Sequence, residues 1–150
     1  MKIRNGFVSN SSSSSFVVTK SKGCFEKKRE LNKYIIGKNG ETEFGWNRSP
    51  YYDSDSKINF SWLQANYIKD NCPEHMEMLM SVLEEWFNCK EIESIIENNW
   101  KTEEGKVYGY IDHQSASYEG ENLEIFDSRK NLINFLFNNE SFLVTDNDNY

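Results

Sequence analysis

The stretch Pro73-Glu-His-Met-Glu-Met-Leu-Met-Ser-Val-Leu-Glu-Glu-Trp-Phe-Asn88 carries the clearest structural pattern in this chain of 150 residues. Pro73 suits the first turn of a helix, where its missing N–H group is not needed. The apolar side chains that follow recur every three or four residues, as they do on one face of an α-helix. They are Met76, Leu79, Met80, Leu83, Trp86 and Phe87. The pattern predicts an amphipathic helix over residues 73–88.

Shorter helical patterns lie on both sides of this stretch. Gly37 follows the first of them, at the place where a helix takes its left-handed C-terminal residue, and Asp127 or Ser128 can cap the last. The predicted helices cover residues 25–36, 58–69 and 91–100, and a segment after residue 128 that contains Leu132, Ile133, Phe135, Leu136 and Phe137.

Short runs of β-branched and aromatic residues predict strands between these helices. The strands cover residues 16–20, 41–46, 107–111, 123–126 and 141–145, and an irregular loop is predicted over residues 46–57 around Pro50. Helices and strands alternate too irregularly for a doubly wound fold. The sequence therefore predicts the α+β class, with a small, mostly antiparallel sheet packed with about four to five helices. A Ser-rich segment over residues 1–15 precedes this single domain of residues 16–150.

Charge is distributed unevenly along the chain, whose net charge is −7. Residues 1–38 hold nine Lys/Arg and two Asp/Glu, a net charge of +7, and residues 39–150 hold eight and twenty-two, a net charge of −14. Such polarity can attract an extended anion to the basic end, or it can be satisfied internally if the basic segment packs on the acidic body. The internal arrangement is favoured. Aromatic residues make up 15% of the chain, so large rings are expected to supply much of the core.

The three cysteines, Cys24, Cys72 and Cys89, lack the even number and the spacing of a disulfide framework, which favours reduced thiols. No apolar run resembles a secretory signal or reaches the roughly 18 to 20 residues of a membrane span. We therefore expect a soluble protein of the cytoplasm without a membrane partner.

Asp112-His113-Gln114-Ser115, at the end of a predicted strand, is the most enzyme-like part of the sequence. His113 could act as a base if acidic or basic partners converge on it, and Glu43, Asp53 and Lys57 are the candidates. They would form a small hydrolase or nuclease-like enzyme. The cysteines and histidines do not form the close pairs of a structural zinc site. No metal and no cofactor is therefore predicted.

Two surfaces are candidates for binding a partner. The first is the acidic face of the predicted helix 73–88, formed by Glu77, Glu84 and Glu85. An acidic face of this kind could occupy a basic groove on another protein. The second is the predicted loop, which carries Trp46, Tyr51, Tyr52 and Asp55.

The stretch Phe7-Val-Ser-Asn-Ser-Ser-Ser-Ser-Ser-Phe16 resembles the N-terminal signature of a group of small uncharacterised proteins of bacteriophages and bacterial mobile elements. Met1-Lys-Ile-Arg4 also fits the start of those chains. The resemblance implies an accessory protein that acts in the cytoplasm of a bacterial host. It brings no catalytic or binding residues with it.

The leading hypothesis is therefore a non-enzymatic, phage-type module that binds or inhibits a host or phage protein, as in host takeover. Nucleic acid is less favoured as a partner because most of the chain is acidic. The alternative is the enzyme built around His113.

Overall fold

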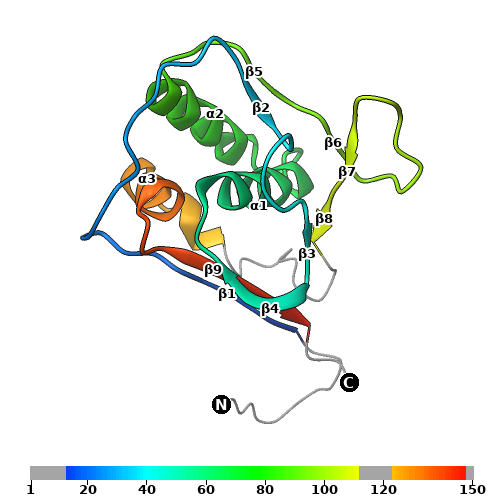
Figure 1. The fold of residues 1–150 in the computed structure, drawn as a ribbon, viewed down its shortest axis with the longest axis horizontal. Coiled ribbons are helices and arrows are strands. Elements are labelled where there is room, and N and C mark those ends of the chain that lie inside the picture. Colours follow the sequence, from blue (N-terminus) through cyan, green and yellow to red (C-terminus); the bar gives the residue numbers. More distant parts are fainter. Residues whose placement is uncertain (1–12, 112–122, 148–150) are drawn as a thin grey trace.

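Three α-helices that pack against one another form the centre of the computed structural model, which describes residues 13–111 and 123–147 (Figure 1). The Asp53 carboxylate caps the first helix by accepting the Ser56 N–H (2.9 Å), and the Ser128 hydroxyl caps the third by accepting the Asn131 N–H (2.9 Å). The second begins at Pro73, as predicted, and ends at Asn88 in the left-handed conformation (φ 47°). The helices are α1 (Ser54–Tyr67), α2 (Pro73–Phe87) and α3 (Arg129–Phe137).

A three-stranded antiparallel sheet lies along one side of the helices (Figure 1). The central strand is the predicted C-terminal one, and its Leu143 and Thr145 are buried. The sheet has the order β1 (Ser13–Val18), β9 (Phe142–Asn147) and β4 (Trp46–Tyr51).

Three pairs of short parallel strands complete the fold. The chain segment that joins β6 and β7 projects from the body, on the right of Figure 1. A 3-10 helix, η1 (Leu123–Phe126), precedes α3. The pairs are β2 (Tyr34–Ile36) with β5 (Ile92–Ser94), β3 (Glu43–Phe44) with β8 (Tyr110–Ile111), and β6 (Ile96–Glu97) with β7 (Val107–Tyr108).

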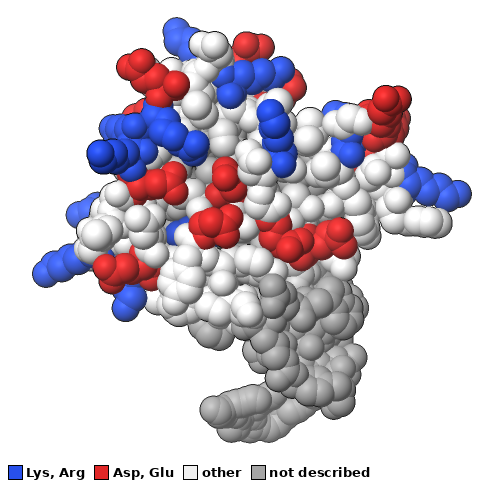
Figure 2. Space-filling model, viewed as in Figure 1, with Lys and Arg blue, Asp and Glu red and all other residues white. Residues whose placement is uncertain are grey.

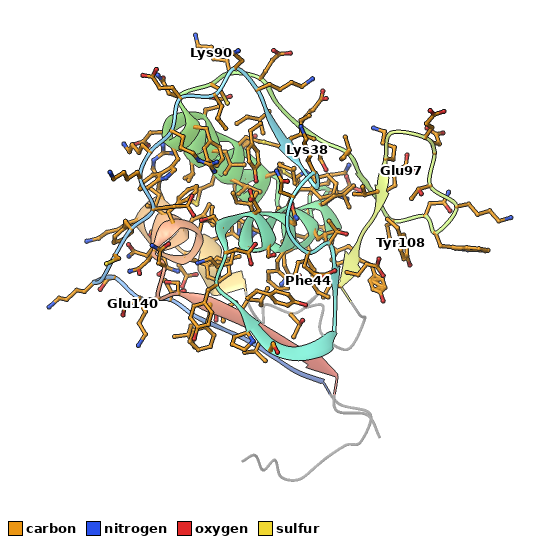
Figure 3. All side chains as sticks on the ribbon, in the orientation of Figure 1. Lys38, Phe44, Lys90, Glu97, Tyr108 and Glu140 are labelled. Atoms are coloured by element: carbon orange, nitrogen blue, oxygen red, sulfur yellow. The ribbon has the colours of Figure 1, made fainter. Side chains whose placement is uncertain are left out.

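Large rings supply much of the core, as expected from the composition. Tyr34 stacks on Phe87 and Trp86 stacks on Phe137, each with 4.4 Å between ring centroids. Phe44, seen pointing inward in Figure 3, meets its ring neighbours edge to face, an arrangement that aromatic quadrupoles favour. The fully buried rings are Phe44, Phe60, Phe87, Phe135 and Phe137.

Within the described residues, part of the basic N-terminal segment packs on the acidic body, as the internal arrangement of charge predicts. Lys28 pairs with Glu85 at 3.3 Å, and Lys33 pairs with Glu93 at 2.9 Å. These pairs are exposed to solvent, so each contributes little to stability. Backbone hydrogen bonds from Arg29 N–H to the Trp86 carbonyl (3.2 Å) and from Leu31 N–H to the Phe87 carbonyl (3.0 Å) fix the segment more firmly.

The predicted number of helices and the single sheet are wrong, although the α+β class is right. The described residues contain three α-helices instead of four to five, and the strands form several small sheets, of which three are parallel pairs. The predicted helices 25–36 and 91–100 contribute strands to the same parallel pair, β2 with β5. Ile92, Ile95 and Ile96 are β-branched, and strand pairing overrides their helical spacing.

Other predicted boundaries also differ. The predicted loop 46–57 forms β4 and the first turn of α1, and the predicted strand 123–126 is the 3-10 helix. Strand β1 begins at Ser13, so the last serines of the Ser-rich segment belong to the sheet.

Gly37 and Gly105 offer a matched test of this packing. Both have positive φ, +102° and +84°, but a Cβ on Gly37 would lie 2.6 Å from Ile96 Cγ1, whereas a Cβ on Gly105 meets nothing within 4 Å. Gly105→Ala should therefore lower the free energy of unfolding by about 1 to 2 kcal/mol through backbone strain alone. Gly37→Ala should lower it by roughly 1 to 3 kcal/mol more, because it also overpacks the core. Urea unfolding measures both, and equal losses would contradict the packing described here.

Candidate functional site

Lys57, one of the predicted catalytic residues, is fully buried and holds the fold together. Its Nζ donates hydrogen bonds to the Asn138 carbonyl (3.1 Å) and the Ser141 carbonyl (2.9 Å), and it lies 5.8 Å from the centroid of the Phe135 ring. Burial lowers the pKa of Lys57 to about 8, although the charges of Glu26 and Asp53 partly oppose the shift. A side chain in this position cannot reach a substrate in solvent.

Lys57 donates its hydrogen bonds to the turn formed by residues 138–141. The same turn is also hydrogen-bonded to the chain that follows β1. The Asn138 side-chain amide donates to the carbonyls of Lys20 (2.8 Å) and Lys22 (3.0 Å). The Lys20 N–H donates to the Ser141 hydroxyl (2.8 Å). We call this set of contacts the Lys57 hub; it joins α1, the turn after α3 and the N-terminal segment.

The other predicted catalytic residues do not form a site. Asp53 accepts the hydrogen bond that begins α1, and Glu43 is exposed on β3. No described hydrogen bond or ion pair joins either carboxylate to Lys57. Glu43 pairs through its backbone with Tyr110 on β8, the strand that leads toward His113. His113 itself lies outside the described residues, and a role for it stays a prediction.

The acidic face predicted on α2 is narrower than its sequence suggests. Glu77 and Glu84 are exposed, but Glu85 bonds both Arg129 and Lys28, and these hydrogen bonds lower its pKa, Arg129 most. Glu85 lines an open groove of about 460 Å³, whose wall contains two acidic and two basic side chains. Its lining is Ser81, Glu84, Glu85, Asn88, Cys89, Lys90 and Arg129.

The second predicted binding surface is largely built into the fold. Trp46 begins β4, while Tyr51 is buried and its ring meets Phe44 edge to face, 5.5 Å between centroids. Asp55 accepts a hydrogen bond from the Tyr34 hydroxyl (2.7 Å). Burial and the Asp55 charge raise the pKa of Tyr34. Of the two tyrosine rings in this set, Tyr52 is the accessible one, since 47% of it is exposed.

Acidic residues from two segments, 41–43 and 53–55, lie around the start of α1. Glu41 approaches the helix by donating its N–H to the Ser56 hydroxyl (2.8 Å), and the Glu43 N–H bonds the Glu41 carboxylate (3.1 Å). Asp53 and Asp55 flank the first residue of the helix. Figure 2 shows acidic side chains gathered across the middle of this face. In the described ranges, no three His, Cys, Asp or Glu side chains are placed to hold a metal ion.

A cavity of about 210 Å³ lies beside these acids, and cationic side chains line part of it. Arg29, Lys33 and Lys38 contribute to its wall together with Asp55. Arg29 pairs with Glu26 at 3.7 Å and Lys33 pairs with Glu93. The cavity therefore has no large excess of positive charge for an anion.

The most accessible large apolar side chain in the described residues was missed by the sequence analysis. Trp100 is 74% exposed and lies on the segment between β6 and β7, residues 98–106, which we call the Trp100 loop. Glu97 and Tyr108 mark its base in Figure 3. Lys101 Nζ is 5.3 Å from the centroid of the indole ring. The polar run Asn98-Asn-Trp-Lys-Thr-Glu-Glu-Gly105 could have indicated this loop, but the prediction of a helix over residues 91–100 hid it.

Over residues 13–111 and 123–147, the fold and its surface define a small α+β protein with one projecting aromatic loop. Comparisons with protein-family models, curated proteins and solved structures found no match. None of the helices in the described ranges has the length and apolar character needed to cross a membrane.

Lys57 should make stability depend on pH. Its pKa is about 8 in the folded protein against an ordinary value of 10.5, so the unfolded chain binds more protons between these values. The free energy of unfolding should therefore rise with pH in this window, by roughly 1 to 2 kcal/mol between pH 7.5 and 9.5. Urea unfolding should show this rise for the wild type and a smaller one for Lys57→Met. If the free energy of unfolding changed equally with pH in the wild type and in Lys57→Met, the role given to Lys57 would be wrong. A loss of stability that is the same at every pH does not affect this comparison.

Trp100 should contribute almost nothing to stability, because its ring packs on little of the protein. Trp100→Ala is expected to change the free energy of unfolding by less than about 0.5 kcal/mol. Trp86→Ala, which removes a buried ring stacked on Phe137, should cost about 3 to 5 kcal/mol. Thermal unfolding compares the two, and a large loss in Trp100→Ala would mean that the loop packs on the body.

Proposed function

We propose that this protein is a phage-type accessory protein of the bacterial cytoplasm that binds another protein through the Trp100 loop and catalyses no reaction. The observation that carries the proposal is the 74% exposure of the Trp100 ring on a projecting loop. The N-terminal signature, residues 7–16, supports the phage-type origin by resemblance. The free thiols of Cys24, Cys72 and Cys89 suit a reducing compartment.

A tryptophan in this position suits the centre of a protein interface. A Trp side chain can bury 150 to 250 Å² or so, and such rings dominate the binding energy of many interfaces. The base of the loop is anchored, because Ile96 is buried and the Gly109 N–H donates to the Glu97 carbonyl (2.9 Å). The ring is therefore presented by two paired strands, which reduces the entropy lost when it binds.

The charges near the loop favour a protein partner over nucleic acid. Glu97, Glu103 and Glu104 lie on the loop or at its base, and Glu43 lies on the neighbouring strand β3. Lys101 and Lys106 offset only part of this charge. A phosphate backbone would be repelled, whereas an apolar pocket rimmed by Lys or Arg on a protein would match both the ring and the acids.

The structure gives less support to the enzyme alternative. Lys57 has its hydrogen bonds within the core, and Asp53 caps α1. Both residues therefore have structural partners that account for their positions without a substrate.

Affinity capture from a bacterial lysate should reveal a protein that the wild type retains and Trp100→Ala loses. Tyr52→Ala is the matched control, because it removes an exposed ring on a different element and should keep the partner. A variant with Glu77→Lys and Glu84→Lys tests the α2 face without disturbing Glu85, whose ion pairs are structural. Mass spectrometry identifies the captured proteins. If Trp100→Ala retains every protein that the wild type retains above an acidic control, the proposal fails.

A further inference from the structure

Among the residues that the structure describes, strand β1 is an edge strand with one unpaired side. All six of its residues keep a continuous antiparallel register with β9, from Ser13 opposite Asn147 to Val18 opposite Phe142. Within the described residues, β9 is its only neighbour in the sheet. The backbone N–H and C=O groups on the other side of β1 therefore form a row that can accept another strand.

The two edges of this sheet differ in how they are protected. Strand β4 carries Arg48 and Pro50, and its register with β9 shifts between Asn47 and Tyr51. A charge, a proline and an irregular register are the usual means by which proteins block an edge. Strand β1, Ser13-Ser-Ser-Phe-Val-Val18, has no charge, no proline and no register shift. In the described part of the chain, the β4 edge is therefore blocked and the β1 edge is open.

We infer that β1 pairs in antiparallel orientation with β1 of a second copy of this chain. Antiparallel pairing of identical strands is two-fold symmetric, so one contact satisfies both copies. The result is a continuous sheet of six strands in the order β4, β9, β1, β1, β9, β4. The remaining edges are the two β4 strands, which are blocked, so assembly stops at the dimer.

Charge also fits a second copy in this orientation. The uncharged strand lets two copies with a net charge of −7 approach without like charges facing each other at the contact. The chain that leaves β1 is basic and exposed at Lys20 and Lys22, whereas β9 carries Asp146 beside the start of β1. Antiparallel pairing brings the basic end of one copy toward the acidic end of the other. A parallel arrangement would bring like charges together.

The sheet surface gives the pairing apolar support. On β9 and β1, the half-buried Phe142 and Val18 face the same side because they are directly opposite in the register. Tyr52 contacts Phe142 with 5.1 Å between ring centroids. In the dimer, the same face of the second copy's sheet would extend this partly apolar surface across the β1–β1 pair. One pair of six-residue strands is a small contact, so the dimer should be weak and depend on concentration.

Sedimentation equilibrium of the full chain tests the inference. The wild type should shift from monomer to dimer as concentration rises, and Ser14→Lys should stay monomeric because a charge on the edge blocks pairing. Ser21→Lys is the matched control: it makes the same charge change just outside β1, and it should still dimerise. Circular dichroism and thermal unfolding check that both variants are folded.

Hydrogen exchange locates the contact independently of any variant. In the wild type, amides of residues 13–18 should become more protected as concentration rises, while those of the Trp100 loop should not change. A monomer at every concentration overturns the inference and leaves the edge to a strand from another protein. A dimer that persists in Ser14→Lys, or that protects other residues instead, also overturns it.

Discussion

The arrangement of the chain depends on one buried ammonium group, that of Lys57. It lies in the core because the carbonyls of Asn138 and Ser141 accept its hydrogen bonds, and those carbonyls belong to a turn that also receives the chain after β1. A buried cation without such partners would cost several kcal/mol. The same contacts hold α1 beside α3 and fix where β9 starts, so the sheet and the helices are positioned by one set of hydrogen bonds.

Several side chains of types that often act in catalysis have structural roles in this fold. Lys57 stabilises a turn, Asp53 begins α1, Asp55 binds a tyrosine hydroxyl, and Glu85 joins two basic side chains. Each of these four side chains has its partners within the protein, inside the core or at its margin. What the body leaves free is a projecting loop with an exposed indole. The proposed binding function therefore rests on a largely exposed side chain, Trp100, that packs on little of the fold.

The sequence pattern predicted correctly the helices that are stabilised by residues within the helix or next to it. The helix 73–88 has its own apolar face, proline and left-handed end, and Ser128 caps the next helix within the same few residues. The helix predictions for residues 25–36 and 91–100 were wrong because the two segments pair with each other as strands. Tyr34 lies opposite Ile92, which is far along the chain. No spacing within either segment reports that contact. The same error concealed Trp100, and the buried role of Lys57 was equally invisible, since its partners lie more than eighty residues further along the chain.

The central claim is that Trp100 is the point of contact with a protein partner. The most direct test places a photoreactive phenylalanine at position 100 and crosslinks it in bacterial cells, with the same substitution at the half-buried Trp62 as the control. The account predicts that position 100 forms a covalent adduct with one other protein and that position 62 does not. Adducts to nucleic acid alone, or none from position 100 while the folded protein is abundant, would contradict it.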